Sequence, residues 1–161
     1  MSDLAVGDRV LVGANTYSEV YMFGHRDASA EATFVTIATS NGQSISLSPN
    51  HYIYVNGKLA VASSVKVGDV VIVRDDSEVT VTAVSQARDT GLYNPHTMQG
   101  DIVVNGVKAS TYTAVVAPAL AHSMLWPARM LYSLGYDIVN GAFDEGSDLL
   151  AAIAPQGRKT Y

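Results

Sequence analysis

The sequence predicts an all-β fold, built from two related halves and followed by one C-terminal helix. Three observations lead to this prediction. Residues 8–112 contain many short runs rich in β-branched and aromatic side chains, several Asn-Gly pairs separate those runs, and the first half of the chain resembles the second. The 161 residues are 48% hydrophobic and only 16% charged, which indicates one domain with a packed core.

Eight runs have the composition of strands, and turn residues bound each of them. They are residues 8–12, 19–23, 33–38, 44–47, 52–55, 69–73, 78–84 and 102–104. The pairs Asn41-Gly42, Asn56-Gly57 and Asn105-Gly106 each predict a tight hairpin, because Asn and Gly tolerate positive φ. Evenly spaced short strands joined in this way are typical of a β-barrel or a β-sandwich.

The two halves share four short segments in the same order. Residues 6–12 (VGDRVLV) resemble 67–73 (VGDVVIV), and 55–60 (VNGKLA) resemble 104–109 (VNGVKA). The shorter matches pair residues 18–20 with 77–79 and, loosely, 49–51 with 94–96. Val-Gly-Asp is common at the start of strands, so chance is the alternative explanation. A duplication predicts a pseudo-twofold β domain with one site shared between the halves.

Residues 116–134 form the predicted helix, with Pro118 in its first turn and Pro127 at a kink or a break. The two prolines, His122 and Arg129 make this stretch a poor membrane span. An amphipathic helix lying on the core or on a membrane surface remains open. The tail after Gly135 is weakly patterned, although residues 148–154 could form a short helix.

Composition excludes several classes of function. The net charge of −5 and the lack of a basic run argue against nucleic acid as the main partner. The chain has no cysteine, which excludes disulfides, cysteine-ligated zinc, iron–sulfur clusters and a thiol nucleophile within it. The four histidines show no metal-ligand spacing and the glycines no phosphate-binding pattern, so neither a metal nor a cofactor is expected. No signal peptide is visible at the start.

Three side chains are candidates for chemistry. His25 follows a predicted strand, and an imidazole there could exchange protons or simply occupy a surface turn. Ser48 and His51 flank Pro49 in a turn between two strands, and the restricted backbone could hold both side chains toward one point. Such a pair can polarise a carbonyl and protonate a leaving amine. His96 is expected in a solvated loop, and His122 is expected to pack on the helix.

Several of these segments, taken in order, resemble the autoprocessing domain of Hedgehog proteins, the Hint (Hedgehog/intein) module. In the first half they are residues 6–11 (VGDRVL), 17–26 (YSEVYMFGHR) and 47–51 (LSPNH). In the second half they are residues 100–112 (GDIVVNGVKASTY), 120–122 (LAH) and 126–131 (WPARML). The resemblance covers about residues 4–135 and implies a pseudo-twofold all-β Hint fold. The expected organisation is therefore a Hint-type domain over 1–135, without its first strands and including helix 116–134, and a weakly structured tail over 136–161.

The resemblance implies self-cleavage. In the family a cysteine at the first position attacks the preceding carbonyl, an N-to-S acyl shift gives a thioester, and a second nucleophile takes the acyl group. By resemblance Ser48 and His51 assist the shift, His25 activates the acceptor, and Thr111 stands where the family has a late cysteine. The substrate is then the chain's own N-terminal flanking segment, and the acceptor is a sterol, water or another nucleophile. The family also suggests a secreted or cell-surface parent protein.

Two departures limit the implied activity. The family cysteine precedes the Gly-Asp-Arg-Val element by about twenty residues, whereas six residues precede Gly7 here, and Thr111 cannot exchange a thioester. As written, the chain is expected not to cleave itself, whether it is a fragment of a longer gene product or a degenerate copy. Two alternatives remain: a non-catalytic β interaction module derived from such a domain, and a conventional serine hydrolase that uses Ser48.

Overall fold

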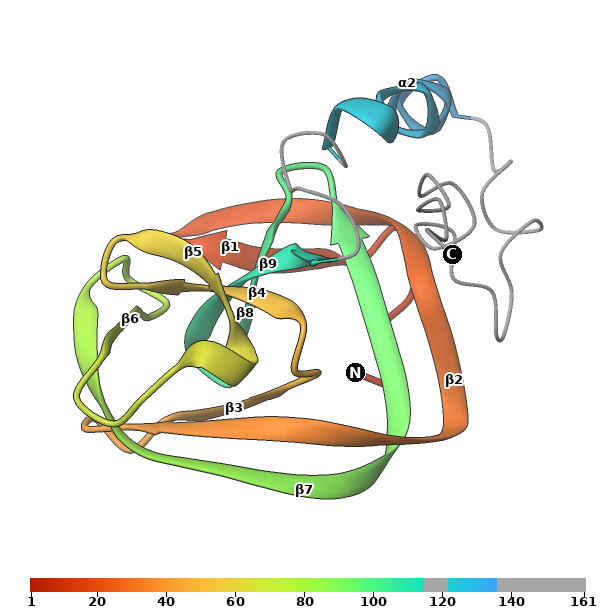
Figure 1. Cartoon of the computed structure of the whole chain (residues 1–161). Coiled ribbons are helices and arrows are strands. Elements are labelled where there is room, and N and C mark those ends of the chain that lie inside the picture. Colours follow the sequence, from red (N-terminus) through yellow and green to blue (C-terminus); the bar gives the residue numbers. More distant parts are fainter. Residues whose placement is uncertain (115–121, 136–161) are drawn as a thin grey trace, which may run out of the picture.

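The computed structural model describes residues 1–114 and 122–135, and in these ranges nine strands form the body of the molecule (Figure 1). The strands are β1 (Arg9–Gly13), β2 (Thr16–Thr39), β3 (Ser44–Leu47), β4 (His51–Val55), β5 (Lys58–Val61), β6 (Val70–Ile72), β7 (Glu78–Thr97), β8 (Asp101–Val104) and β9 (Val107–Thr113). A short 3-10 helix, η1 (Ala62–Ser64), follows β5, and helix α2 (Trp126–Ser133) comes last. The all-β prediction is confirmed.

Two long strands organise the sheet. β2 pairs with β7 in antiparallel register, from Val20 opposite Thr97 to Thr39 opposite Val81. Both strands bend sharply in Figure 1, so that the sheet curls around its own interior. The remaining strands continue the order β1-β2-β7-β6-β4-β9-β8, with β3 added to β2 and β5 added to β4. β8 is the last strand of this path.

Strand lengths were the main error of the sequence prediction. The runs 19–23 and 33–38 belong to one strand, β2, and the run 78–84 is only the first part of β7, which continues to Thr97. β5 and β9 were not among the eight predicted runs, because Lys58–Val61 is short and Val107–Thr113 contains Lys and Ala, which have low strand propensity. The hairpins predicted at Asn56-Gly57 and Asn105-Gly106 nevertheless implied a strand after each turn. Both segments become strands through hairpin pairing with β4 and β8.

The three predicted hairpins are present. The Asn-Gly pairs at 56–57 and 105–106 have positive φ at both residues, 50° and 75° in the first and 49° and 87° in the second. This is the pattern of a type I′ turn, whose twist matches that of the flanking strands. The connection from β2 to β3 covers residues 40–43 and is longer than the other two turns. In this connection only Gly42 has a positive φ, 81°.

The two halves repeat each other in their hydrogen bonds. The Gly7 amide donates to the Val20 carbonyl at 2.8 Å, and the Gly68 amide donates to the Val81 carbonyl at 2.9 Å. The return bonds, from the Val20 and Val81 amides to the carbonyls of the residues after each glycine, are 2.9 and 2.8 Å long. Both glycines have φ 94°, which side chains rarely adopt. The recurring Val-Gly-Asp element is therefore one backbone motif used twice, as a pseudo-twofold fold requires.

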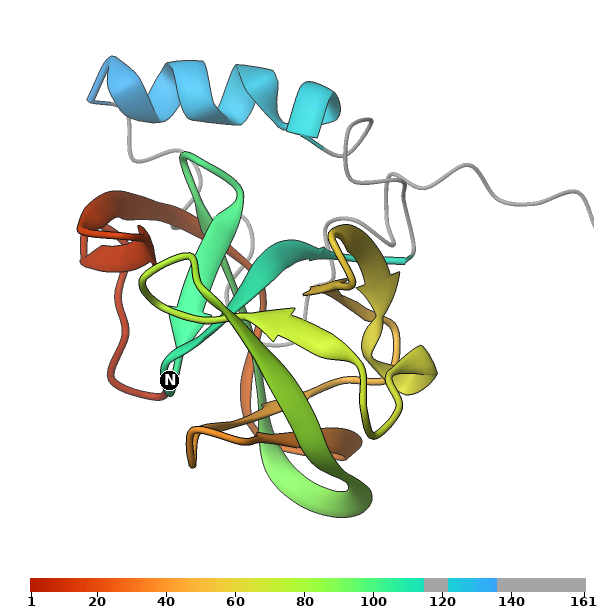
Figure 2. The same cartoon turned by 90° about the vertical axis from the view of Figure 1, so that its left-hand side faces the viewer.

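Two clusters of buried side chains form the core. The larger fills the interior of the curled sheet: Val35, Ile37, Ile45, Leu47, Ile53, Val55, Ala62, Val65, Val71, Val81, Val107 and Ala109. The smaller, made of Tyr21, Met22, Tyr112 and Leu125, joins the sheet to the helical segment. Arg129 of α2 is also buried. Figure 2 shows the helix lying across one side of the β domain.

The predicted helix over 116–134 is interrupted. Residues 122–124 are helical, Leu125 leaves the helix with φ −86° and ψ 3°, and α2 restarts at Trp126 with Pro127 in its first turn. A proline fits there because the first amides of a helix have no intrahelical acceptor, so Pro127 splits the segment. Pro118 and the predicted short helix over 148–154 lie outside the described residues. Within the described residues, no helix is both long and apolar enough to cross a bilayer.

Candidate active site

One cavity of about 370 Å³ brings together all four residues that the sequence singled out. His25 comes from β2, Ser48 and His51 from the turn before β4 and from its first residue, and Thr111 from β9. These segments are far apart in sequence, and the curled sheet places them around one space. The other walls are mainly apolar, from Phe34, Leu47, Leu92, Tyr93, Pro95, Ile102, Val104 and Ala109.

A short turn fixes Ser48 and His51 relative to each other. The His51 amide donates to the Ser48 carbonyl at 2.9 Å, which closes a β-turn with Pro49 at its second position. The turn is held from both sides, since the Ser63 amide donates to the Pro49 carbonyl at 2.9 Å and the Ala114 amide to the Asn50 carbonyl at 2.8 Å. Both candidate side chains therefore project from a rigid backbone.

The tautomer of His51 follows from its hydrogen bond. Its Nε2 lies 2.8 Å from the carbonyl oxygen of Ser110. A carbonyl oxygen only accepts, so Nε2 carries the proton and neutral His51 keeps a lone pair on Nδ1. Burial lowers the pKa of His51 below its usual value, against a smaller opposing effect of the Ser110 carbonyl. At neutral pH the imidazole is therefore uncharged and can accept a proton at Nδ1.

A β-bulge aims His25 at the cavity. Phe23 pairs with Pro95 and His25 pairs with Asn94, so two steps along β2 match one step along β7 and Gly24 is the extra residue. A side chain at Gly24 would not fit, because its Cβ would lie 2.7 Å from Nε2 of His96. The Nε2 atom of His25 is buried and has no hydrogen-bond partner in the part of the chain that the structure describes.

Thr111 is fully buried and its hydroxyl is already engaged. It donates to the carbonyl of Gly100 at 3.1 Å, and the Thr111 amide donates to the same oxygen at 2.8 Å. The residue lines the cavity, but this pair of bonds ties it to the loop before β8. Any catalytic part for Thr111 remains a prediction.

The expectation for His96 was wrong. The residue is not in a solvated loop: it lies near the end of β7 and has no exposed surface. Its ring packs between Tyr21 and Tyr112, with ring centroids 6.4 and 5.4 Å away. Desolvation, with a smaller effect of nearby His51, lowers the pKa of His96 to about 3. The prediction for His96 failed because the strand predicted over 78–84 does not end there. β7 continues through Pro95 to Thr97 and carries His96 into the core.

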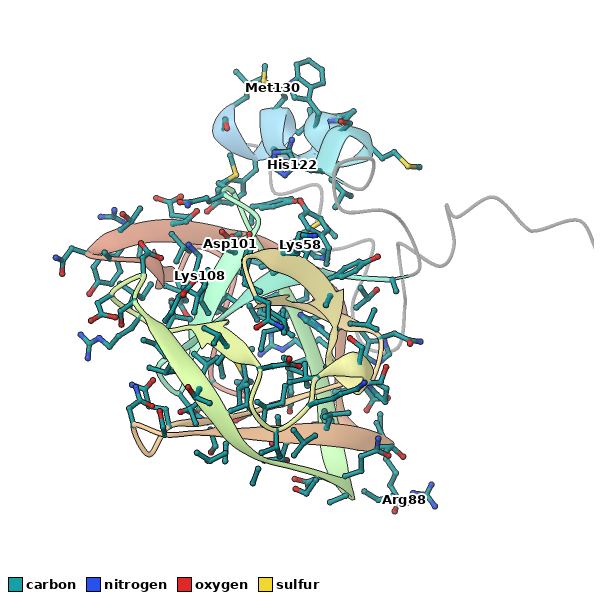
Figure 3. The ribbon with its side chains drawn as sticks, turned by 60° about the vertical axis from the view of Figure 1, so that its left-hand side comes forward. Lys58, Arg88, Asp101, Lys108, His122 and Met130 are labelled. Atoms are coloured by element: carbon teal, nitrogen blue, oxygen red, sulfur yellow. The ribbon has the colours of Figure 1, made fainter. Side chains whose placement is uncertain are left out.

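Sequence reasoning also missed Asn94 and Gly24. Asn94 lines the cavity opposite His25, and its Nδ2 lies 3.4 Å from Nε2 of His96. The only signal for it was the loose match of residues 94–96 to 49–51. His122, expected to pack on the helix, contacts the sheet: its Nδ1 is 2.8 Å from the Tyr112 hydroxyl. Figure 3 shows it between the helix and the β domain. No group of three or more metal-ligating side chains was found among the described residues.

Chemically, the cavity is lined by a neutral base with an unprotonated nitrogen, by a hydroxyl and by a second imidazole. Those groups suit proton transfer and carbonyl polarisation. The chain has no cysteine, so a thiol nucleophile has to be supplied from outside these 161 residues.

Comparison with known proteins places these features in a family. The model of the Hint module matches residues 1–154. Warthog protein 6 of Caenorhabditis elegans is 40% identical over 134 residues, which is 74% of this chain and 23% of that protein. Protein hedgehog of Drosophila virilis is 35% identical over 148 residues, 83% of this chain and 31% of that protein. The chain thus spans about a quarter to a third of these curated relatives.

Solved structures share the fold at lower identity. The gp41-1 intein superposes with a TM-score of 0.60 at 18% identity, covering 68% of this chain and 84% of the intein. The MchDnaB-1 intein superposes with a TM-score of 0.59 at 16% identity, covering 68% and 87%. The pseudo-twofold β domain derived above is the fold of these proteins.

Proposed function

Because this chain belongs to the Hint module family, whose Hedgehog members are autoprocessing proteins, we propose that its cavity cleaves the peptide bond before a cysteine on its own N-terminal flanking segment. The observation that carries the proposal is the convergence of His25, Ser48 and His51 on one cavity of about 370 Å³. The chain itself supplies the site but not the thiol.

The first step would be an N-to-S acyl shift at the cysteine. The thiol sulfur bonds to the preceding carbonyl carbon, the C–N bond breaks, and the thiol proton ends on the freed amine. His51 suits this transfer, since its Nδ1 is unprotonated and can take the thiol proton and return it to the amine nitrogen. The Ser48 hydroxyl would donate to the carbonyl oxygen as negative charge develops on it.

The second step would transfer the acyl group to an acceptor. The acceptor bonds to the thioester carbon, the C–S bond breaks, and the sulfur leaves as thiolate. His25 lines the same cavity as the Ser48–His51 turn and would take the acceptor's proton at Nε2. A sterol hydroxyl and water are the two acceptors that the family resemblance suggests.

A groove beside β8 gives the flanking segment a place to lie. β8 ends the strand order and pairs only with β9 among the described strands. A second cavity, of about 640 Å³, is lined by Leu4, Val10 and Ile102–Val104 and reaches Met1. Met1 also lines the catalytic cavity. A segment lying in this groove, between β1 and β8, would thus lead toward the cavity that His25 and His51 line.

The test extends the chain at its N terminus with the residues that its gene encodes immediately upstream. We expect cleavage before a cysteine in that segment, accelerated by dithiothreitol, with two products whose masses sum to the precursor plus the added nucleophile. The Ser48→Ala variant should cleave more slowly, and Ser63→Ala, an exposed serine in η1, should match the parent.

An upstream segment with no cysteine, or a precursor that stays intact with added thiol, would refute self-cleavage. That result would favour the non-catalytic β interaction module, for which His25, Ser48 and His51 could each become alanine without consequence.

We also propose that α2 contacts a membrane surface. Trp126, Met130 and Leu134 recur every four residues and are 57, 42 and 65% exposed. Figure 3 shows Met130 on the side of the helix that faces away from the β domain. Large exposed apolar groups in one stripe mark an interaction surface. The stripe carries no charge, so a neutral bilayer suits it better than an anionic one.

Trp126 is the only tryptophan and reports on this contact directly. Vesicles of phosphatidylcholine are expected to shift its fluorescence emission to shorter wavelength and to protect it from acrylamide. Met130→Glu should weaken both effects, whereas Arg88→Glu, an exposed position at the end of the β domain away from the helix in Figure 3, should not. Emission that does not respond to vesicles would rule out the membrane contact.

A further inference from the structure

The cavity contains a second unpaired polar group that the proposed steps do not use. The Oδ1 atom of Asn94 is buried and, like Nε2 of His25, has no hydrogen-bond partner within residues 1–114 and 122–135. Leaving a buried acceptor unpaired is unfavourable, so such groups in native structures call for an explanation. Both residues line the same cavity, and a ligand of that cavity is the natural partner for both.

The two side chains face each other across neighbouring strands. His25 and Asn94 are direct partners in the antiparallel β2–β7 pair. Directly opposite residues project from the same face of a sheet, with Cβ atoms roughly 4.5–5.5 Å apart. One small nucleophilic atom can therefore contact both groups at once.

In the structure the Asn94 amide has its Nδ2 toward buried His96, 3.4 Å from Nε2 of that ring. An amide NH₂ group only donates, so in this arrangement Nε2 of His96 accepts and the His96 proton is on Nδ1. Oδ1 of Asn94 then remains as an acceptor for a ligand of the cavity. Gly24 makes this arrangement possible, since a Cβ there would approach Nε2 of His96 to 2.7 Å and Nδ2 of Asn94 to 3.1 Å.

The site therefore presents two acceptors to the incoming nucleophile. Nε2 of His25 has to be unprotonated to take the reacting proton, and Oδ1 of Asn94 can only accept. An alcohol or a thiol has one hydrogen on its nucleophilic atom, and that hydrogen goes to His25. Water and a primary amine have two, so the second can be donated to Asn94.

We propose that Asn94 is a specificity-determining residue that selects an acceptor with two hydrogens on its nucleophilic atom, water or a primary amine, over an alcohol. With water, the oxygen bonds to the thioester carbon, the C–S bond breaks, one proton passes to Nε2 of His25, and the second hydrogen stays on the new carboxyl group. That hydrogen donates to Oδ1 of Asn94 throughout the attack. The proposal rests on the self-cleavage proposed above.

The experiment uses the upstream-extended chain and separates the two steps. Cleavage by dithiothreitol, which carries one hydrogen on each sulfur, measures the acyl shift. Cleavage in buffer alone measures hydrolysis. Benzylamine and benzyl alcohol are a matched pair of organic acceptors. Asn94→Ala is expected to slow hydrolysis and transfer to benzylamine by on the order of tenfold, since each loses one hydrogen bond. Thiolysis and transfer to benzyl alcohol should stay within about twofold of the parent.

Two further variants exclude a general structural effect. Gln86→Ala removes an exposed amide from the same strand, outside the cavity, and should behave as the parent. Asn94→Asp keeps an acceptor oxygen at the same position, so its hydrolysis and its transfer to benzylamine should be faster than those of Asn94→Ala. A merely structural role would not separate water and benzylamine from benzyl alcohol in this way.

The outcomes are distinguishable. If dithiothreitol fails to cleave the parent, the proposed self-cleavage fails and this inference falls with it. If dithiothreitol cleaves and Asn94→Ala slows all four acceptors equally, or none of them, self-cleavage stands and the selection by Asn94 is refuted.

Discussion

Replacing His51 with glutamine in the upstream-extended chain is expected to slow thiol-induced cleavage by about 10²- to 10⁴-fold, the usual contribution of a positioned general acid–base. Glutamine can still donate to the Ser110 carbonyl, so the turn before β4 should remain in place. It cannot accept and return a proton as the free Nδ1 of histidine does. Single-turnover cleavage, followed by gel and mass spectrometry, gives the rate ratio.

The matched control is Asn50→Ala in the same turn. Asn50 is exposed and contributes its backbone carbonyl, not its side chain, to the bond with the Ala114 amide. We expect this variant to cleave at the parent rate and to unfold at the same temperature. Equal losses in both variants would assign the effect to the turn as a whole instead of to the His51 imidazole.

The free energy of unfolding is expected to fall as the pH is lowered, because the fold keeps its buried histidines uncharged. His96 is neutral in the folded state with a pKa of about 3, against about 6.5 in an unfolded chain. Between those values the unfolded state binds the extra proton, so stability falls as pH falls, by about 1.4 kcal/mol per pH unit for one such group. His51, whose pKa burial also lowers, acts in the same direction.

Urea unfolding at a series of pH values between 7 and 4 measures this slope. His96→Leu removes the titrating group and should flatten the dependence by up to about 1.4 kcal/mol per pH unit. His122→Gln leaves buried His96 in place and should keep most of the slope. A His96→Leu chain that loses stability with acid as steeply as the parent would show that His96 is not the group responsible.

The fold could be predicted because the evidence for it is local. Val-Gly-Asp at residues 6–8 and 67–69 dictates a positive φ and a fixed set of hydrogen bonds, and Asn-Gly at 56–57 and 105–106 dictates a type I′ turn. Strand ends were less predictable, since the second half of β7 is a strand only through its pairing with β2, which is remote in sequence. The curl of β2 and β7 is likewise a property of the whole sheet.

The site was predictable in part for the same reason. The Ser48–His51 turn is local, and its geometry follows from Pro49. Asn94 and Gly24 could not be assigned from the sequence, because their meaning depends on a bulge in the pairing of β2 with β7 and on contact with His96. The burial of His96 was hidden too, because no local pattern shows that β7 runs on to Thr97.

A crystal structure of the upstream-extended chain, with its candidate cysteine changed to alanine to stop the reaction, tests the central claim most directly. We expect that alanine to lie in the cavity lined by His25, Ser48 and His51, with the preceding carbonyl within hydrogen-bond reach of the Ser48 hydroxyl. An alanine placed outside this cavity, with His51 and His25 facing no part of the flanking segment, would contradict the account.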